Sequence, residues 1–230
     1  MAKSKLLVLI PAFNEENTIK KVIRDIKNHT KKYATQIIVI NDGSLDSTGK
    51  IAKGEKVTVI THILNRGLGA SINTGLEYAK AKVFDVLITF DADGQHDAAK
   101  IPTLVKPILS GKADITIGTR LHPKSKSMPT ERTLVNKIAN FTTFLLTGVY
   151  SSDTQSGFRG FSKKAVSLLN ITSQRMEVSS EIFKEIKRNS FRFSEIPIDA
   201  VYTSYSLSKG QSITNAPNVL LKLAISLMRK

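Results

Sequence analysis

The sequence contains no cysteine and no tryptophan, and its acidic residues are few beside its basic ones. The lack of cysteine excludes disulfides, thiolate metal sites and cysteine nucleophiles, and it fits a reducing compartment. No apolar run reaches the roughly 18 residues that a transmembrane helix needs, so we predict no such helix. The N-terminal residues lack the long apolar core of a signal peptide. We therefore expect a cytoplasmic protein that can associate peripherally with the cytoplasmic face of a membrane.

The excess of positive charge points to anionic partners. Lysine and arginine number 34 against 19 acidic residues, which gives a net charge of +15 and a pI near 9.9. Such a surface favours nucleic acid, anionic lipid headgroups or phosphorylated small molecules. No predicted helix has a dense basic face interleaved with aromatic residues, and none of the usual nucleic-acid-binding motifs occurs. We expect no nucleic-acid partner and keep a basic nucleic-acid-binding protein as a remote alternative.

Short apolar runs alternate with helical segments along the first half of the chain. The runs rich in β-branched residues read as buried strands. They are Leu6–Ile10, Ile37–Ile40, Val57–Ile60, Val86–Phe90 and Asp114–Arg120. This alternation with short loops is typical of βαβ units around a right-handed parallel sheet. Uninterrupted apolar strands agree, because parallel strands are covered on both faces. The sequence therefore predicts an α/β fold with a mostly parallel sheet flanked by helices.

Helices are expected between and after these strands. Asn14–Asn17 combines an N-cap residue with an acidic first turn and is predicted to open the first helix. A later helix carries four apolar residues in helical register: Leu134, Ile138, Phe141 and Leu145. Two further helical stretches are expected at Lys163–Leu169 and Ser179–Arg188.

No linker rich in glycine, proline or serine divides the chain, so we predict one domain at residues 1–212 with two functional halves, 1–120 and 121–212. Residues 213–230 are predicted to form an amphipathic C-terminal helix that is too short to span a bilayer. Two interpretations of this helix stay open. It either packs on the sheet and closes the domain, or lies at the surface of an anionic membrane.

The polar segment Asp91–Asp97 follows directly after the strand Val86–Phe90. In open α/β sheets, ligands bind at the carboxyl ends of strands. Asp91 and Asp93 are two residues apart and can point to one side of an extended chain. Two close carboxylates repel each other unless a cation lies between them, and Mg²⁺ or Mn²⁺ suits oxygen ligands. Gln95 adds an amide oxygen. The competing interpretation is a polar loop with aspartates at turn positions.

Polar residues also follow the other predicted strands, at Pro11–Glu15, Asn41–Ser44 and Asn65–Gly67. In a parallel sheet these segments should converge along one edge, beside Asp91. Gly67 and Gly69 precede a predicted helix and could cradle a phosphate. A role in forming a turn is the simpler interpretation of the two glycines.

Together these segments resemble the inverting family-2 glycosyltransferases of the glycosyltransferase-A fold. The similarity is greatest to the dolichol-phosphate mannosyltransferase-like group, which uses polyprenyl phosphates. The matching stretches are Pro11–Glu15, Asn41–Ser47, Asn65–Gly75, Asp91–Gln95 and Asp153–Phe158. They occur in the right order and extend over roughly Leu6 to Phe161. Each would be weak evidence alone, but together they are quite specific.

The resemblance implies that the first half of the chain binds a nucleotide-diphosphate sugar linked to GDP or UDP. The residues implied in donor binding are Pro11, Asn14, Glu15, Asp42, Arg66 and Asp91. Mg²⁺ or Mn²⁺ on the diphosphate would be held by Asp91, Asp93 and Gln95. A divalent cation stabilises a departing nucleoside diphosphate as charge builds on it. For Glu15 and Asp42 taken singly, a helix-cap or turn role is an equal alternative.

The resemblance further implies that the acceptor is a polyisoprenyl phosphate, such as a dolichyl or undecaprenyl phosphate, whose phosphate is held by arginines. The residues expected at that phosphate are Arg120, Arg132, Ser156 and Lys209. The catalytic set implied by the resemblance is Asp93, Arg120 and Asp153. Most scattered basic residues, Arg159 among them, are expected on the solvated surface. Arg120 is the exception, because it ends a strand at the ligand-binding edge.

The chemistry of the acceptor separates two enzyme hypotheses. A phosphate monoester has a second pKa near ~6 and is already an anionic nucleophile at neutral pH. A hydroxyl of a soluble glycan or protein would need a general base, and Asp153 is the candidate. The polyprenyl-phosphate hypothesis implies an anionic membrane surface as a partner, and an integral-membrane partner protein is a further partner that we consider.

Overall fold

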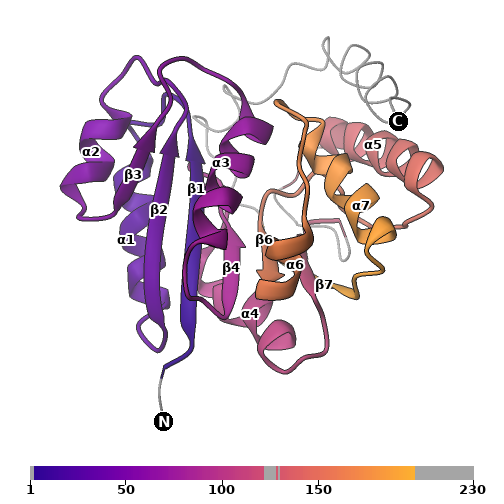
Figure 1. The fold of residues 1–230 in the computed structure, drawn as a ribbon. Helices are drawn as coiled ribbons and strands as arrows, with labels where there is room; N and C mark the ends of the chain where they lie inside the picture. Colours follow the sequence, from indigo (N-terminus) through magenta and orange to yellow (C-terminus); the bar gives the residue numbers. More distant parts are fainter. Residues whose placement is uncertain (1–2, 122–127, 129, 200–230) are drawn as a thin grey trace.

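The computed structural model describes residues 3–121, 128 and 130–199, and in these residues seven strands form one sheet (Figure 1). The strands are β1 Lys5–Ala12, β2 Ala34–Asn41, β3 Thr58–Thr61, β4 Val86–Thr89, β5 Ile115–Thr119, β6 Arg159–Ser162 and β7 Phe193–Pro197. Their order across the sheet is β3-β2-β1-β4-β6-β5-β7. The expected α/β architecture with a mostly parallel sheet is confirmed.

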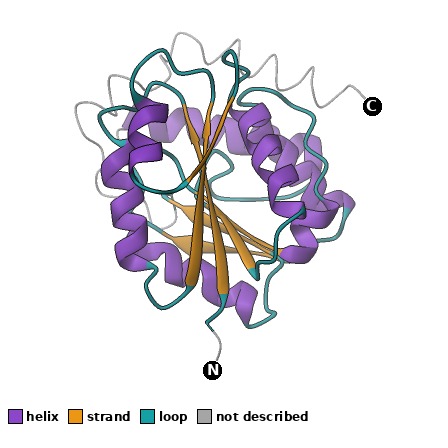
Figure 2. Cartoon of the chain, turned by 60° about the vertical axis from the view of Figure 1, so that its left-hand side comes forward, coloured by secondary structure: helices purple, strands orange, loops and turns teal. Residues whose placement is uncertain are grey.

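Helices cover both faces of this sheet (Figure 2). The helices are α1 Ile19–His29, α2 Thr48–Gly54, α3 Leu68–Lys80, the 3₁₀ turn η1 Ala98–Lys100, α4 Ile101–Leu109, α5 Thr130–Thr147, α6 Lys163–Leu168 and α7 Val178–Arg188. One apolar core joins α1, α2 and α4 to the sheet, and a second joins α3, α6 and α7 to its other face. No helix in the described part of the chain is long and apolar enough to cross a membrane.

The first four strands run in parallel, as the sequence predicts. β1 pairs with β2 on one side and with β4 on the other, and β3 extends the sheet beyond β2. Every residue from Leu6 to Ile10 is almost fully buried, because both faces of this strand are covered. The carboxyl ends of the four strands therefore meet at one edge.

β6 is a strand that the sequence did not reveal. It has only four residues, and it runs antiparallel to both β4 and β5. Its first residue, Arg159, pairs with Thr89 at the carboxyl end of β4. The segment Asp153–Phe158 that precedes β6 is thereby delivered to the edge where the parallel strands end.

α1 begins later than predicted, at Ile19, with Thr18 in the N-cap position and no acidic residue in its first turn. Asn14 has a positive φ of 54°, which is incompatible with a helix. Its backbone N–H donates to Ser44 Oγ at 3.0 Å, and its side-chain oxygen accepts from the backbone N–H of Leu45 at 2.8 Å. The predicted helix start is therefore a loop that is bonded to the loop after β2.

The apolar stripe of α5 faces solvent. Leu134, Ile138, Phe141 and Leu145 are 61%, 43%, 61% and 66% exposed, although they share one side of the helix as predicted. The side that packs on the protein is small and polar. Its buried members are Thr133, Ala139, Thr143 and Thr147. The amphipathicity of α5 is thus inverted relative to that of an ordinary surface helix.

Candidate active site at the carboxyl edge of the sheet

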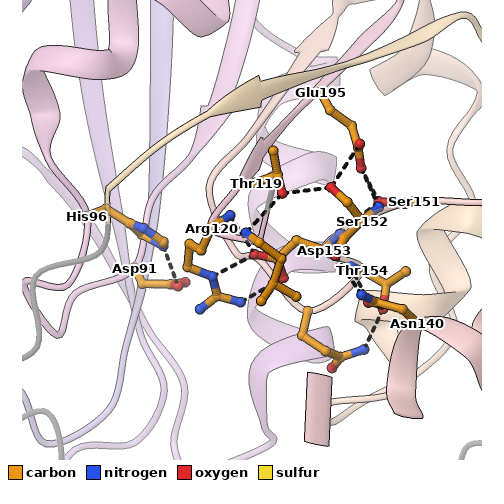
Figure 3. A network of polar contacts seen from close by, with 12 residues as sticks. Asp91, His96, Thr119, Arg120, Asn140, Ser151, Ser152, Asp153, Thr154 and Glu195 are labelled. Atoms are coloured by element: carbon orange, nitrogen blue, oxygen red, sulfur yellow. Dashed lines mark hydrogen bonds and ion pairs between the residues drawn. The ribbon is translucent and has the colours of Figure 1, made fainter. Parts of the chain in front are cut away.

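Asp91 lies at the centre of this edge, immediately beyond β4. The Nε2–H of His96 donates to Asp91 Oδ2 at 2.8 Å (Figure 3), and the His96 ring packs against Phe90 and Phe158. Burial acts to raise the pKa of Asp91, but the hydrogen bond and the positive charges of His96, Arg120 and Arg159 outweigh it and lower this pKa. Asp91 is therefore an ionised and firmly oriented carboxylate.

Asp93 follows in a tight turn, in which Gly94 has a φ of +76°. Asp93 Oδ1 accepts from the backbone N–H of Gln95 at 2.9 Å. Burial and the negative charge of Asp91 raise the pKa of Asp93. This like-charge repulsion is the signature of a pair that a cation would stabilise. In the described residues no three His, Cys, Asp or Glu side chains converge on one point. The two carboxylates have the chemistry that suits a hard divalent cation with further ligands from outside the protein, and a contribution from the amide of Gln95 stays a prediction.

Glu15 joins the loop after β1 to the start of α2. Its backbone N–H donates to Thr48 Oγ1 at 2.7 Å, and its carboxylate accepts from Thr18 Oγ1 at 2.8 Å. Glu15 is buried, whereas Pro11 at the end of β1 is half-buried. The predicted donor-binding residues of this loop are therefore brought together, and their contact with a donor stays a prediction.

Both carboxylate oxygens of Asp42 are used inside the protein. Oδ1 accepts from His62 Nδ1 at 2.6 Å and from the backbone N–H of Arg66 at 3.0 Å, while Oδ2 accepts from the backbone N–H of Gly67 at 2.7 Å. His62 is the partner that sequence reasoning missed. Asp42 holds the loop before α3 in place, and the side chain of Arg66 is exposed beside it.

Gly67 at the N-cap of α3 forms a turn, and Gly69 in the first turn of this helix allows a close contact. Gly67 has a φ of +98°, which favours glycine. At Gly69 a Cβ would overlap the carbonyl of Ser173. The backbone N–H of Ala70 donates to the carbonyl of Gln174 at 3.0 Å. The positive φ of Gly67 and the protein carbonyl bound at Ala70 favour the turn interpretation of these two glycines, and a phosphate cradle at this position stays an untested alternative.

Arg120 and Asp153 form a bidentate ion pair close to Asp91 (Figure 3). Arg120 Nε and Nη2 donate to the two carboxylate oxygens at 2.7 and 2.8 Å, and the backbone N–H of Arg120 donates at 3.0 Å. Asp153 is fully buried, while a small part of the Arg120 side chain reaches solvent. The pair unites the end of β5 with the segment before β6.

A second layer of contacts holds the Asp153 segment. Glu195 of β7 accepts from Ser151 Oγ at 2.6 Å and from the backbone N–H of Ser152 at 2.7 Å. Asn140 of α5 accepts from the backbone N–H of Thr154 at 2.8 Å and donates to the carbonyl of Ser152 at 2.6 Å (Figure 3). Sequence reasoning missed Glu195 and Asn140, because only the tertiary structure brings them to this loop.

The remaining predicted acceptor residues have different locations. Ser156 is fully buried beside the site, and Arg132 is half-buried in the first turn of α5. Lys209 and the predicted C-terminal helix lie outside the described residues. Arg159, expected on the solvated surface, is instead only 3% exposed at the start of β6. The expectation failed because Arg159 belongs to the strand that the sequence did not reveal.

The mostly parallel seven-stranded sheet, with the Asp91–Asp93 pair and the buried Arg120–Asp153 pair at one edge, is an α/β fold with a candidate active site at the carboxyl ends of its strands. The sequence pattern described as Glycosyl transferase family 2 matches residues 7–169, and the chain belongs to this family. It is an enzyme, a glycosyltransferase, with the glycosyltransferase-A fold that the resemblance implies.

Several curated proteins are similar over almost the whole chain. The UDP-N-acetylglucosamine–dolichyl-phosphate N-acetylglucosaminyltransferase of Methanococcus voltae is 35% identical, with 100% of this chain and 99% of that protein covered. The polyprenol monophosphomannose synthase of Mycolicibacterium smegmatis is 26% identical, with 96% and 86% covered. An uncharacterised protein of Methanocaldococcus jannaschii is 40% identical, with 96% and 91% covered.

Solved structures confirm the fold. The glucosyl-3-phosphoglycerate synthase of Mycobacterium tuberculosis, crystallised with Mn²⁺, UDP and phosphoglyceric acid, superposes with a TM-score of 0.76. The match covers 98% of this chain and 78% of that one, at 18% sequence identity.

Proposed function

We propose that this enzyme transfers a sugar, with inversion, from a nucleotide-diphosphate sugar to a polyisoprenyl phosphate. The observation that carries the proposal is the Arg120–Asp153 pair, which holds a guanidinium at the same sheet edge as the Asp91 and Asp93 carboxylates. The guanidinium of Arg120 thus lies close to the acidic donor site, where we expect it to contribute to binding the acceptor phosphate. Similar proteins named for transfer to dolichyl phosphate and polyprenol phosphate support this choice of acceptor.

For the donor, we assign Pro11, Asn14, Glu15, Asp42 and Arg66 to the nucleoside end, in the 1–120 half of the chain. Asp91, Asp93 and Gln95 would hold Mg²⁺ or Mn²⁺ against the diphosphate. The bound cation would supply charge stabilisation for the departing nucleoside diphosphate. His96 keeps Asp91 oriented through the 2.8 Å hydrogen bond, so that the donor meets a preformed carboxylate.

For the acceptor, we assign the phosphate to Arg120, together with Arg132 and Ser156 of the 121–212 half. A phosphate oxygen would attack the anomeric carbon, while the bond from that carbon to the diphosphate oxygen breaks and its electron pair leaves with the nucleoside diphosphate. No general base is required, because the phosphate is already largely ionised. Both oxygens of Asp153 bind Arg120, so this carboxylate is poorly placed to act as a base for a hydroxyl acceptor.

We also propose peripheral contact with an anionic membrane, where such an acceptor resides. The exposed stripe of Leu134, Ile138, Phe141 and Leu145 on α5 supports this contact, since a helix lies in a membrane interface by burying its apolar face. The net charge of +15 adds attraction to anionic lipid. On the opposite side of α5, Asn140 binds the Asp153 segment. The apolar stripe and the proposed acceptor site therefore lie on opposite sides of the same helix.

The deciding experiment assays radiolabelled UDP- and GDP-sugars with two acceptors, a polyprenyl phosphate in detergent and a panel of soluble glycans and peptides. Labelled product in the organic phase with the polyprenyl phosphate alone is the expected result. Transfer to a hydroxyl acceptor at a comparable rate would refute the proposed acceptor. Release of free sugar with every acceptor, and no labelled transfer product, would show hydrolysis of the donor and refute the proposed transfer.

A further inference from the structure

The carboxylate of Glu195 has no role in the proposed function, although it reaches the segment that carries Asp153 (Figure 3). β7 pairs in parallel with β5, which places Glu195 opposite Ile117, near the carboxyl end of β5. Its Oε1 accepts from Ser151 Oγ at 2.6 Å and from the backbone N–H of Ser152 at 2.7 Å, and its Oε2 accepts from Ser152 Oγ at 2.9 Å. Both oxygens of this side chain of β7 therefore bind the segment before β6.

These contacts determine the direction in which the neighbouring hydroxyl groups donate. A carboxylate has no proton to give, so the hydroxyl of Ser152 donates to Glu195. The oxygen of Ser152 also lies 2.7 Å from Thr119 Oγ1, and it has only acceptor capacity left, so Thr119 donates to it. Thr119 Oγ1 in turn accepts from the backbone N–H of Leu121 at 3.3 Å. We call these linked hydrogen bonds of Thr119, Ser151, Ser152 and Glu195 the Glu195 network, in which neighbouring bonds polarise one another.

The Glu195 network ends beside both members of the Arg120–Asp153 pair. Arg120 follows Thr119 directly in the sequence, and Asp153 follows Ser152. The backbone N–H of Asp153 also donates to the hydroxyl of the serine two residues before it, at 3.3 Å. Glu195 is thus bound directly to the segment that carries the carboxylate of the pair. Through two hydroxyl groups it is also connected to the strand end that carries the guanidinium.

The residues assigned to the donor are held by other contacts. The loop after β1 is bonded through Asn14 to Ser44 and through Glu15 to Thr48. Three strands, β4, β6 and β5, lie between β1 and β7 in the sheet. A displacement at Glu195 should therefore reach the acceptor side of the site and leave the donor side in place.

We propose that Glu195 is a positioning residue for the acceptor, which holds the Arg120 guanidinium in the orientation that binds the acceptor phosphate. The inference rests on the proposed function and adds the side chain that orients its acceptor site. A guanidinium presents its donors in one plane, so its contact with a phosphate depends on the direction of that plane. Asp153 binds two nitrogens of Arg120, and the Glu195 network holds the backbone on both sides of this pair.

The test measures the steady-state KM of the purified enzyme for two substrates, undecaprenyl phosphate in detergent and the nucleotide sugar that the wild type uses. The variants are Glu195→Ala, Ser152→Ala and the double variant. We expect the KM for undecaprenyl phosphate to rise at least tenfold in Glu195→Ala and at least fivefold in Ser152→Ala. The donor KM should change less than twofold in both. Because the two residues act through one network, the double variant should be no more than about twice as impaired as Glu195→Ala.

Glu195→Gln tests whether hydrogen bonds carry the effect. The amide oxygen can still accept from Ser151 and from the backbone of Ser152, while the amide nitrogen can donate to Ser152 Oγ. Ser152 then donates to Thr119, so the network persists with one bond reversed. We expect the KM for undecaprenyl phosphate to return to within about threefold of the wild-type value.

Glu185→Gln is the matched control. Glu185 is a buried carboxylate of α7 that accepts from the backbone N–H of Asn170 at 3.2 Å and pairs with Arg188, outside the Glu195 network. Its substitution should lower the thermal stability and leave the ratio of the two KM values unchanged, as expected for a carboxylate with a structural role alone.

The same pattern in Glu195→Ala, lower stability with an unchanged KM ratio, would overturn the positioning role and leave the proposed function standing. Effects that multiply in the double variant would equally refute action through Ser152. If Glu195→Ala does not fold, Ser152→Ala decides, because it keeps the carboxylate and its other contacts; an unchanged acceptor KM in this variant would overturn the inference. A wild type that transfers no sugar to undecaprenyl phosphate would refute the proposed function itself.

Discussion

The backbone of Gly157 lies directly against the carboxylate of Asp91, so close that a Cβ at position 157 would overlap both carboxylate oxygens. The carbonyl of Gly157 also accepts from Thr89 Oγ1 at 2.7 Å. These two contacts attach the Asp153–Phe158 segment to the strand that carries Asp91. The glycine of this segment is therefore required by contact with another part of the site.

Gly157→Ala should lower kcat/KM by about a hundredfold, since a displacement of about 1 Å at a reacting centre has an effect of this order. The added methyl group would push the Asp91 carboxylate out of its position. The matched control is Gly54→Ala, because a Cβ at this exposed glycine meets nothing within 4 Å. Steady-state kinetics and circular dichroism of both variants make the measurement. Full activity in Gly157→Ala would contradict the tight contact.

Asp93→Asn should abolish transfer while leaving the fold intact, and EDTA should do the same to the wild type. The amide removes half of the negative charge that the proposed cation neutralises. Added Mn²⁺ or Mg²⁺ should restore the EDTA-treated wild type. The control is Asp97→Asn, since Asp97 caps the η1 turn through Ala99 and an asparagine preserves such a cap. Full activity of the wild type in EDTA would refute the metal requirement.

The affinity for Mn²⁺ should fall as the pH is lowered, beginning above the range in which an ordinary aspartate titrates. Burial and the charge of Asp91 raise the pKa of Asp93, so protons compete with the cation at a higher pH. Calorimetric titration of Mn²⁺ at a series of pH values makes the measurement. An affinity that stays constant until the pH reaches the ordinary aspartate range would contradict a metal site in which Asp93, with its raised pKa, is a ligand.

Arg120→Lys should raise the KM for polyprenyl phosphate at least tenfold and leave the donor KM nearly unchanged. Lysine keeps the charge but loses the forked pair of bonds to Asp153. Arg24→Lys is the control, because Arg24 forms its ion pair with Glu55 far from the site.

Asp153→Asn should destabilise the fold far more than Arg120→Lys does. Breaking a buried pair costs roughly 3–5 kcal/mol of unfolding free energy, which urea titration would detect.

Asp114→Asn should destabilise the protein at neutral pH, and its difference from the wild type should shrink in acid. Arg192 hydrogen-bonds Asp114 and lowers the pKa of this carboxyl, joining β5 to the start of β7. A lowered folded-state pKa contributes stability above the unfolded pKa, and this contribution is lost as the pH falls through the folded pKa. Asp25→Asn on the solvent-facing side of α1, where Asp25 pairs with Lys21, is the control. A difference that is independent of pH would refute the linkage.

The double variant Phe141→Glu with Leu145→Glu should no longer co-sediment with anionic vesicles, and its thermal stability should stay close to that of the wild type. Both side chains are mostly exposed, so the charges cost the fold little while they repel anionic lipid. Val83→Glu, an equally exposed apolar position after α3, is the control and should bind as the wild type does. Vesicle binding that survives the double variant would move the membrane contact elsewhere on the protein.

The sequence by itself determined the parallel half of the sheet and the positions of its polar strand ends. Buried parallel strands need unbroken apolar runs, and such runs are legible locally in Leu6–Ile10 and Val86–Phe90. Asp91 and Asp93 follow from the same pattern, because a parallel sheet brings its strand ends to one edge. The family resemblance rested on these segments too, and the comparison with family 2 confirmed it.

Only the tertiary structure decided which of the other residues meet at that edge. Strand β6 has four residues and gains its stability from both neighbours, so no local pattern announces it. With β6 in place, Arg159 becomes buried, and Gly157 comes into contact with Asp91. The sequence likewise did not determine which side of α5 packs against the protein. Periodicity shows that Leu134 and Phe141 share a side of the helix, whereas the polar contacts of Asn140 with the Asp153 segment determine which side turns inward.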